Sequence, residues 1–277
     1  MSLLTTDSST VQEGALLFLA HLGIAEPPIT VERVLEGLGV ESHPLPTFDI
    51  DRLTPEQLKH YHALKPVRGL LSPAEQRIYF SDELSTRQYP WLIYHESGHV
   101  LIDWHREALY VDNDYRLSQR AIDQMEKEAN EFAGHLQFLG TRFADESRSM
   151  PFGLGTAVDL ADLFVATYES AIRHYVETRE ENCICLVCRV IPAAEGARTL
   201  RFQYFIKPKP SRGFWNFEFK SGHVFPLDDE VVQLLNQGVL DGASPHNGTY
   251  YSQDSKQAYQ RQVFCNGHSV FVLVSTI

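Results

Sequence analysis

The chain has 277 residues, 43% hydrophobic and 22% charged, and a formal net charge of −12. This composition is typical of globular proteins and excludes a disordered or fibrous class. No apolar run approaches the roughly 20 residues that cross a membrane, and residues 1–10 lack the basic-then-apolar pattern of a signal peptide. Four cysteines in this length do not form a disulfide framework. We therefore expect a cytoplasmic protein without a membrane partner.

The charge is unevenly distributed along the chain. Residues 179–277 contain 10 Lys/Arg and 9 Asp/Glu, whereas the rest of the chain contains 14 and 27. The N-terminal part should therefore repel nucleic acid and favour a basic partner surface, while the C-terminal part carries no such repulsion.

The first third of the chain predicts short helices and a strand. Residues 10–22 and 30–38 have apolar side chains at helical spacing, the second with Thr30 as a suitable N-cap. A strand is predicted at residues 40–45, and a short helix is predicted to begin at Thr54.

Residues 67–80 predict a β-hairpin that turns at residues 72–75. Its second strand, Arg77–Phe80, could form the edge to which an extended substrate peptide adds as a further strand. The simpler alternative is a sheet edge that packs on the following helix.

A His-Glu-x-x-His motif begins at His95, in a segment whose apolar residues predict a buried helix over residues 91–104. His95 and His99 are four residues apart and share a helix face, so both imidazoles can bind one zinc ion. Glu96 can act as the general base for a water on that metal, and Gly98 allows a neighbouring backbone to approach closely. The alternative is an amphipathic helix with two histidines on its edge.

A catalytic zinc site usually has three protein ligands and one water. His105 follows His99 at the spacing of the metzincin pattern, but that pattern needs a turn-forming Gly where this chain has Ile102. Residues 100–104 also predict a continuing helix. We therefore expect His105 to be a polar residue just past the helix end.

Residues 121–139 predict a second helix that carries better candidates for the third ligand. Glu126 and Asn130 share a face, so the carboxylate can complete the zinc site while the amide hydrogen-bonds a motif histidine. Glu128 is the rival ligand and lies roughly opposite on the helix. We favour Glu126 because only it has this partner four residues later. The alternative is that these acidic residues form a solvated face.

Together these motifs resemble those of the ImmA/IrrE family of metallopeptidases, over roughly residues 10–178. The resemblance is carried by the hairpin, the His-Glu-x-x-His helix and the motif Glu-x-Glu-Ala-Asn-x-Phe-Ala at residues 126–133. It implies a gluzincin-like zinc site with Glu96 as the general base. The chain departs from the family at residues 135–140, where members often have Leu-Leu-Met-Pro, which affects the substrate groove and not the zinc chemistry.

Members of this family commonly cut a helix-turn-helix repressor encoded beside them. The resemblance therefore implies a protein partner of that kind as the substrate.

The rest of the N-terminal part is expected to support this site. Residues 106–120 predict a polar loop, and residues 157–177 predict two helices that resemble the helix-turn-helix-like end of the family's catalytic domain. Because this segment has more acidic than basic side chains, we expect it to pack and not to read DNA. We therefore predict a peptidase domain over residues 1–178 and a second domain over residues 179–277.

The second domain is predicted to be rich in β-structure and compatible with a GAF-like sensor domain. Strands are predicted at residues 183–191, 200–206, 214–219 and 263–274, and one helix near residues 229–237. Such a domain could bind a small-molecule or DNA activator.

Two features of this domain have both functional and structural interpretations. Basic and aromatic residues alternate in one segment, a pattern that can bind single-stranded nucleic acid by stacking on its bases. The alternative, which we favour, is a hairpin whose aromatic side chains face the core. The candidate contacts are Arg201, Tyr204, Lys207, Lys209, Arg212 and Trp215. Cys183, Cys185 and Cys188 could form a redox or metal cluster, but cysteine in an apolar strand packs as a small hydrophobe, which we also favour.

The sequence thus predicts an α+β protein with a mainly helical, gluzincin-like peptidase domain and a small sheet, followed by a β-rich domain. The predicted function is a zinc-dependent endopeptidase that cleaves a helix-turn-helix repressor and so derepresses stress-response, phage-defence or mobile-element genes. The alternative is a regulatory sensor whose C-terminal domain binds a small ligand or single-stranded DNA, with a gated or degenerate peptidase.

Overall fold

A computed structural model describes residues 8–45, 68–110, 118–209, 220–242, 244–251 and 258–276. The chain forms two compact units. The first contains the residues up to Arg142 together with Leu163–Ala166, and the second contains Phe143–Asp162 and Thr167–Ile277. The sequence-based boundary between residues 178 and 179 falls inside the second unit, and the division into domains at that point stays a prediction.

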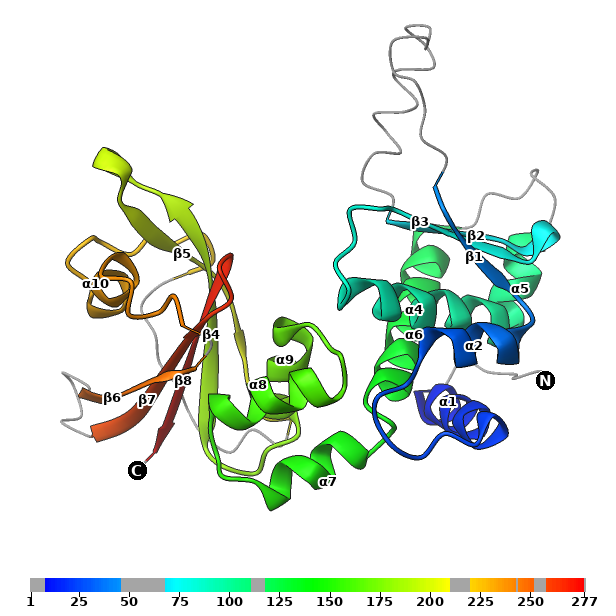
Figure 1. Ribbon diagram of the computed structural model, residues 1–277, viewed down its shortest axis with the longest axis horizontal. Helices are drawn as coiled ribbons and strands as arrows, with labels where there is room; N and C mark the ends of the chain where they lie inside the picture. The colour runs from blue at the N-terminus through cyan, green and yellow to red at the C-terminus, as the bar shows by residue number, and fades with distance from the viewer. Residues whose placement is uncertain are drawn as a thin grey trace, which may run out of the picture. The chain divides into compact units, whose positions relative to one another are not determined.

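The first unit is mainly helical (Figure 1). Its helices are α1 (Ser8–Leu22), α2 (Val31–Leu38), α4 (Gln88–Leu101), α5 (Asp103–Tyr110) and α6 (Gln119–Gln137). Helix α6 packs against both α1 and α4, and the apolar side chains at these contacts are fully buried, among them Phe18, Ile93 and Phe132. Helix α2 ends as predicted, because Gly39 adopts a positive φ of 68° and caps the helix with its N–H.

A three-stranded sheet lies beside these helices, with β1 (Glu41–Pro44), β2 (Gly69–Ser72) and β3 (Arg77–Phe80) in the order β1-β3-β2. Strands β2 and β3 form the predicted antiparallel hairpin around the short helix η2 (Pro73–Glu75). The prediction that Arg77–Phe80 is an edge strand is wrong, because β1 pairs in parallel along its other side. The helix predicted to begin at Thr54 lies outside the described residues.

The helix that carries the His-Glu-x-x-His motif begins and ends three residues earlier than predicted. Helix α4 ends at Leu101, and Ile102 has an extended backbone, with φ −83° and ψ 112°. Helix α5 then begins at Asp103 in a new direction, so the polar loop predicted from residue 106 is helical as far as Tyr110. A β-branched residue favours extended backbone, which fits the break at Ile102.

The second unit begins with three helices, α7 (Arg142–Ser149), α8 (Leu154–Leu163) and α9 (Tyr168–Glu177). The last two confirm the pair predicted within residues 157–177. Thr167 caps α9 by accepting a hydrogen bond from the N–H of Ser170.

One arginine holds the start of this unit together. Arg179 donates from Nη1 to the Ser147 carbonyl over 2.9 Å and forms a fork with the Glu181 carboxylate. Its guanidinium also lies 5.4 Å from the ring centroid of Phe152 and 5.1 Å from that of Tyr175.

The rest of the second unit is a five-stranded antiparallel sheet with the order β5-β4-β8-β7-β6. Its strands are β4 (Cys183–Pro192), β5 (Arg198–Ile206), β6 (His246–Tyr251), β7 (Ala258–Cys265) and β8 (Ser269–Thr276). Helix α10 (Glu230–Asn236) covers one face, where its Val232 and Leu235 enter the core that the strands form.

The fold is therefore α+β, as predicted, with a helical N-terminal region and small mixed sheet followed by the antiparallel sheet. The GAF-like assignment stays a prediction, and the strand predicted at residues 214–219 lies outside the described residues. Among the helices of the described part, none combines the length and the apolar character needed to cross a membrane.

Candidate metal centre

The site begins where α4 packs against α6 (Figure 1). A Cβ atom built on Gly98 would lie 3.0 Å from the Ala129 Cα and 3.2 Å from the Phe132 Cβ. These distances are shorter than ordinary contacts between carbon atoms. Glycine at this position therefore lets the two helices approach until the side chains of the motif and those of α6 meet.

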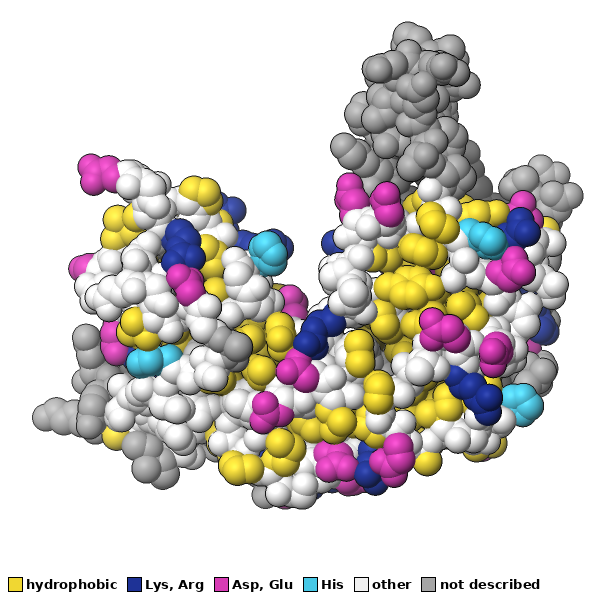
Figure 2. All heavy atoms as spheres, in the orientation of Figure 1, with side chains coloured by type: hydrophobic (Ala, Val, Ile, Leu, Met, Phe, Trp, Pro, Cys, Tyr) yellow, Lys and Arg dark blue, Asp and Glu magenta, His cyan; other side chains and the backbone are white. Residues whose placement is uncertain are grey.

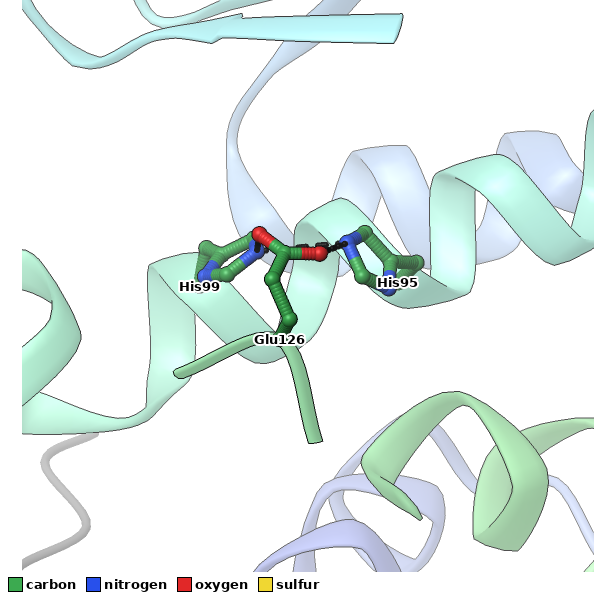
Figure 3. A group of neighbouring side chains, drawn as sticks. All are labelled: His95, His99 and Glu126. Carbon is green, nitrogen blue, oxygen red and sulfur yellow. Dashed lines mark hydrogen bonds and ion pairs between the residues drawn. The ribbon is translucent and has the colours of Figure 1, made fainter. Parts of the chain in front are cut away.

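Three of these side chains converge on one point. The Nε2 atoms of His95 and His99 lie 3.2 Å apart, and the Glu126 carboxylate lies 3.4 Å from the first and 3.6 Å from the second. Figure 3 shows this carboxylate between the two imidazole rings. One ligand atom from each residue lies within 4.8 Å of the others, an arrangement that could hold a metal ion. Two imidazole nitrogens and one carboxylate oxygen are a donor set that suits zinc.

Both imidazoles are held in the form that binds a metal. Burial is the main cause that lowers the pKa of His95, and it lowers the pKa of His99 to about 3. The rings are therefore neutral near pH 7, as metal ligands must be. The Oδ1 atom of Asn130 lies 3.2 Å from the Nδ1 atom of His95. Because a carbonyl oxygen only accepts, the proton of His95 is on Nδ1 and the lone pair of Nε2 faces the other two side chains.

Glu96 lies on the same helix and is 7% exposed. Burial raises the pKa of its carboxyl group to about 7, and the nearby charge of Glu126 acts in the same direction. A carboxyl group with such a pKa can accept and release a proton near neutral pH.

Residues 41–173 match the model of the family Peptidase_M78, described as an IrrE N-terminal-like domain. Over these residues the chain matches the ImmA/IrrE metallopeptidase family. The matched residues include all three members of the convergent group and Glu96. The family resemblance found in the sequence is therefore confirmed, and the metal group lies within the matched segment.

Among curated proteins none matches the chain. Solved structures match it only at low sequence identity. A Mycobacterium tuberculosis transcriptional regulator is 12% identical with a TM-score of 0.51, covering 96% of this chain and 87% of its own. At this identity the likeness shows the fold alone. A Bacillus subtilis YkuI protein with an EAL domain, solved with c-di-GMP and calcium, is 10% identical. The match covers 98% of this chain and 67% of the YkuI chain. Its TM-score of 0.22 is too low to support any inference.

The rival ligand Glu128 points away from the metal group. It is 3% exposed, and its Oε2 atom accepts from Trp104 Nε1 over 2.8 Å and lies 3.1 Å from His105 Nε2. Its Oε1 atom accepts from Gln124 Nε2 over 2.6 Å. This placement supports Glu126 as the ligand, a role that stays a prediction.

The structure gives His105, which the sequence suggested only as an unfavoured zinc ligand, a different place. His105 is fully buried, and its Nδ1 atom lies 3.2 Å from the Nδ1 atom of His99, on the opposite side of that ring from Glu126. The expectation that it is a polar residue just past the helix end is wrong, because the chain turns at Ile102 and continues as α5. The apolar residues that predict a buried helix over residues 91–104, Trp104 among them, were the sequence signal for burial near His105.

Two of the candidate nucleic-acid contacts are engaged within the second unit. The hydroxyl of Tyr204 hydrogen-bonds the Glu169 carboxylate, and the guanidinium of Arg173 lies 4.9 Å from the centre of its ring. The Lys209 amine lies 3.2 Å from the Glu177 carboxylate. The guanidinium of Arg173 therefore already occupies one face of this ring.

The other candidate contacts do not test the nucleic-acid prediction. Arg201 and Lys207 are exposed, whereas Arg212 and Trp215 lie outside the described residues. On the face drawn in Figure 2, basic side chains stand among acidic and hydrophobic ones. Contact with nucleic acid therefore stays a prediction.

The cysteines of β4 pack in the core, as predicted. Cys183, Cys185 and Cys188 are buried free thiols, and burial raises the pKa of Cys183 and of Cys188 to about 12. Thiols held in the neutral form are poor nucleophiles and poor metal ligands.

Proposed function

We propose that the protein is a zinc-dependent endopeptidase and that its substrate is a helix-turn-helix transcriptional repressor. The observation that carries the proposal is the convergence of His95, His99 and Glu126 in a domain of a metallopeptidase family. The repressor substrate rests on the family resemblance alone. In this reading, cleavage derepresses genes for stress response, phage defence or mobile elements.

Each side chain has a defined task in this proposal. His95 and His99 bind the metal through Nε2, and Glu126 binds it through its carboxylate. Zinc, when bound, supplies a Lewis acid that polarises a water and the substrate carbonyl. Glu96, with a pKa of about 7, takes a proton from the attacking water and returns it to the leaving amine.

The decisive experiment separates proton transfer from metal binding. Glu96→Gln keeps the three ligands and removes the base, so it should retain zinc while cleavage of the repressor falls by about 10²–10⁴-fold. Glu126→Ala should lose zinc. Glu13→Gln is the matched control, because Glu13 lies on the exposed face of α1. Zinc content is measured by elemental analysis and cleavage by gel electrophoresis. A Glu96→Gln variant that cuts at the wild-type rate would refute the mechanism.

A second function for the same chain is sensing by the second unit, with the peptidase under its control. The metal group and Glu96 come entirely from the first unit, so the antiparallel sheet and α10 need another role. The activator in this proposal is a small ligand or single-stranded DNA. Repressor cleavage is measured with and without single-stranded oligonucleotides and nucleotides, in the wild type and in a variant with Arg201 and Lys207 both changed to Ala. Rates that do not respond to any addition would contradict this function.

A further inference from the structure

A chain of hydrogen bonds runs behind His99, away from the metal group. The Nδ1 atom of His99 lies 3.2 Å from His105 Nδ1, and His105 Nε2 lies 3.1 Å from Glu128 Oε2. His105 is fully buried and Glu128 is 3% exposed. Trp104 and Gln124 also donate to the Glu128 carboxylate, over 2.8 Å and 2.6 Å.

The chemistry of these groups fixes the direction of every hydrogen bond. A carboxylate only accepts, so the N–H on Nε2 of His105 donates to Glu128. In a neutral imidazole the other nitrogen carries a lone pair, so Nδ1 of His105 accepts. The proton between the two histidines therefore belongs to Nδ1 of His99. It follows that Nε2 of His99 presents a lone pair, and this is the atom that faces His95 and Glu126.

We propose that His105 and Glu128 are positioning residues that hold His99 in the tautomer and orientation needed for metal binding. The proposal rests on the proposed function, because it concerns the same metal group. Neither residue contacts Glu126 or the reacting atoms; both act through His99. Partners behind a metal-binding histidine typically change metal affinity by about 10- to 100-fold when removed.

The geometry of the backbone makes this chain of hydrogen bonds possible; we call the chain from His99 through His105 to Glu128 the relay. On a continuous helix, residues 99 and 105 would be six positions apart and would point in directions about 240° apart. The break at Ile102 redirects α5, so that His105 returns to the back of His99 and meets Glu128 from α6. Glu126 thereby lies next to Nε2 of His99 directly, while Glu128, two positions later on the same helix, acts on Nδ1 of that ring through His105.

The burial of Glu128 supports a specific role over simple packing. A carboxylate removed from water costs free energy that its hydrogen bonds must offset. A purely structural core position would be filled at lower cost by an apolar side chain of similar volume. Glu128 instead keeps three N–H donors, and one of them comes from the histidine that contacts a candidate ligand.

Two substitutions break the relay at different points, and a third restores part of it. In Glu128→Gln, the amide presents N–H donors as well as an acceptor, so the hydrogen-bond direction is no longer fixed. His105→Phe removes the acceptor for His99, whereas His105→Gln retains a carbonyl oxygen that can take its place. Asp123→Asn is the matched control, because Asp123 lies on the exposed face of the same helix α6.

The experiment measures the zinc dissociation constant of the full-length protein by competition with a chromophoric chelator. We expect Glu128→Gln and His105→Phe to raise it about 10- to 100-fold, and His105→Gln to raise it less than His105→Phe. Asp123→Asn should leave it unchanged. A second readout is independent of the metal: ¹⁵N–¹H spectra of the imidazoles should show His99 protonated on Nδ1 in the metal-free wild type and a mixture of tautomers in Glu128→Gln.

The outcomes are distinguishable. Wild-type zinc affinity in Glu128→Gln and His105→Phe, whatever their thermal stability, would overturn the relay while leaving the peptidase proposal intact. If His105→Phe does not fold, Glu128→Gln alone decides. A wild-type protein that binds no zinc would overturn the proposed function and the relay with it.

Discussion

The contact between α4 and α6 at Gly98 gives a sharp test of how the site is held. Gly98→Ala adds one methyl group at the point where the helices are closest. That methyl would lie 3.0 Å from the Ala129 Cα, a backbone atom that cannot rotate away. Because non-bonded carbon atoms prefer about 3.5–4.0 Å, α6 must move outward by roughly 0.5–1 Å.

This displacement is large on the scale of a metal site. Glu126 lies on α6 one turn before Ala129, so it moves with the contact, while His95 and His99 stay on α4. Metal sites tolerate about ±0.2 Å in their ligand distances, so we expect zinc affinity to fall by about 10- to 100-fold, the loss typical of a misplaced supporting group. Overpacking costs about 1–3 kcal/mol, and the better helix propensity of alanine offsets up to about 1 kcal/mol.

The matched control is Gly134→Ala on α6, the helix that Gly98→Ala would displace. An added Cβ there meets no atom within 4 Å, so this variant should be more stable by up to about 1 kcal/mol with unchanged zinc affinity. Urea unfolding of the metal-free proteins and chelator competition give the two quantities. If Gly98→Ala binds zinc like the wild type and gains stability like Gly134→Ala, the spacing of α4 and α6 does not position the site.

Other predictions test the core, the second unit and the metal. Phe132→Ala removes a fully buried ring beside Gly98 and should cost about 3–5 kcal/mol in urea unfolding. Arg179→Lys loses the planar fork to Glu181 and should cost about 1–3 kcal/mol. Because Arg179 lowers the pKa of Glu181 below its usual 4.5, this contribution is present above pH 4.5 and is lost as the pH falls further. The stability gap between the two proteins should therefore narrow in acid without closing, because the contacts of Arg179 with Ser147, Phe152 and Tyr175 do not titrate. A gap of the same size at every pH would contradict the assignment. Zinc at 1,000 times its dissociation constant should stabilise the first unit by about 4 kcal/mol in thermal unfolding, and Glu126→Ala should abolish this gain.

Most of the metal group could be predicted from sequence because its geometry is local. His95 and His99 are one helical turn apart, and so are Glu126 and Asn130, so each pair shares a face whatever the rest of the chain does. Only the contact between the two helices is non-local, and Gly98 gave a signal for it. The convergence of the three candidate ligands therefore required little beyond helical periodicity and the resemblance to a family.

The features that the sequence predicted wrongly depend on contacts between distant parts of the chain. The strand β3 was predicted at an edge because its hairpin partner is adjacent in sequence, whereas its parallel partner β1 lies some 36 residues earlier. The break at Ile102 escaped notice because a β-branched residue lowers helix propensity by only a few tenths of a kcal/mol, and many helices contain one. Neither feature has a local pattern that distinguishes it.

The break at Ile102 and the glycine at position 98 act on the same imidazole from different directions. Gly98 sets how close α6 comes to α4, and so where the Glu126 carboxylate stands relative to Nε2 of His99. Ile102 sets where α5 begins, and so whether His105 reaches Nδ1 of that ring. Because Glu128, on α6, anchors His105, a shift of this one helix disturbs both nitrogens together. The motif supplies the histidines, but the spacing of α4 and α6 decides whether His99 is both correctly protonated and correctly aimed.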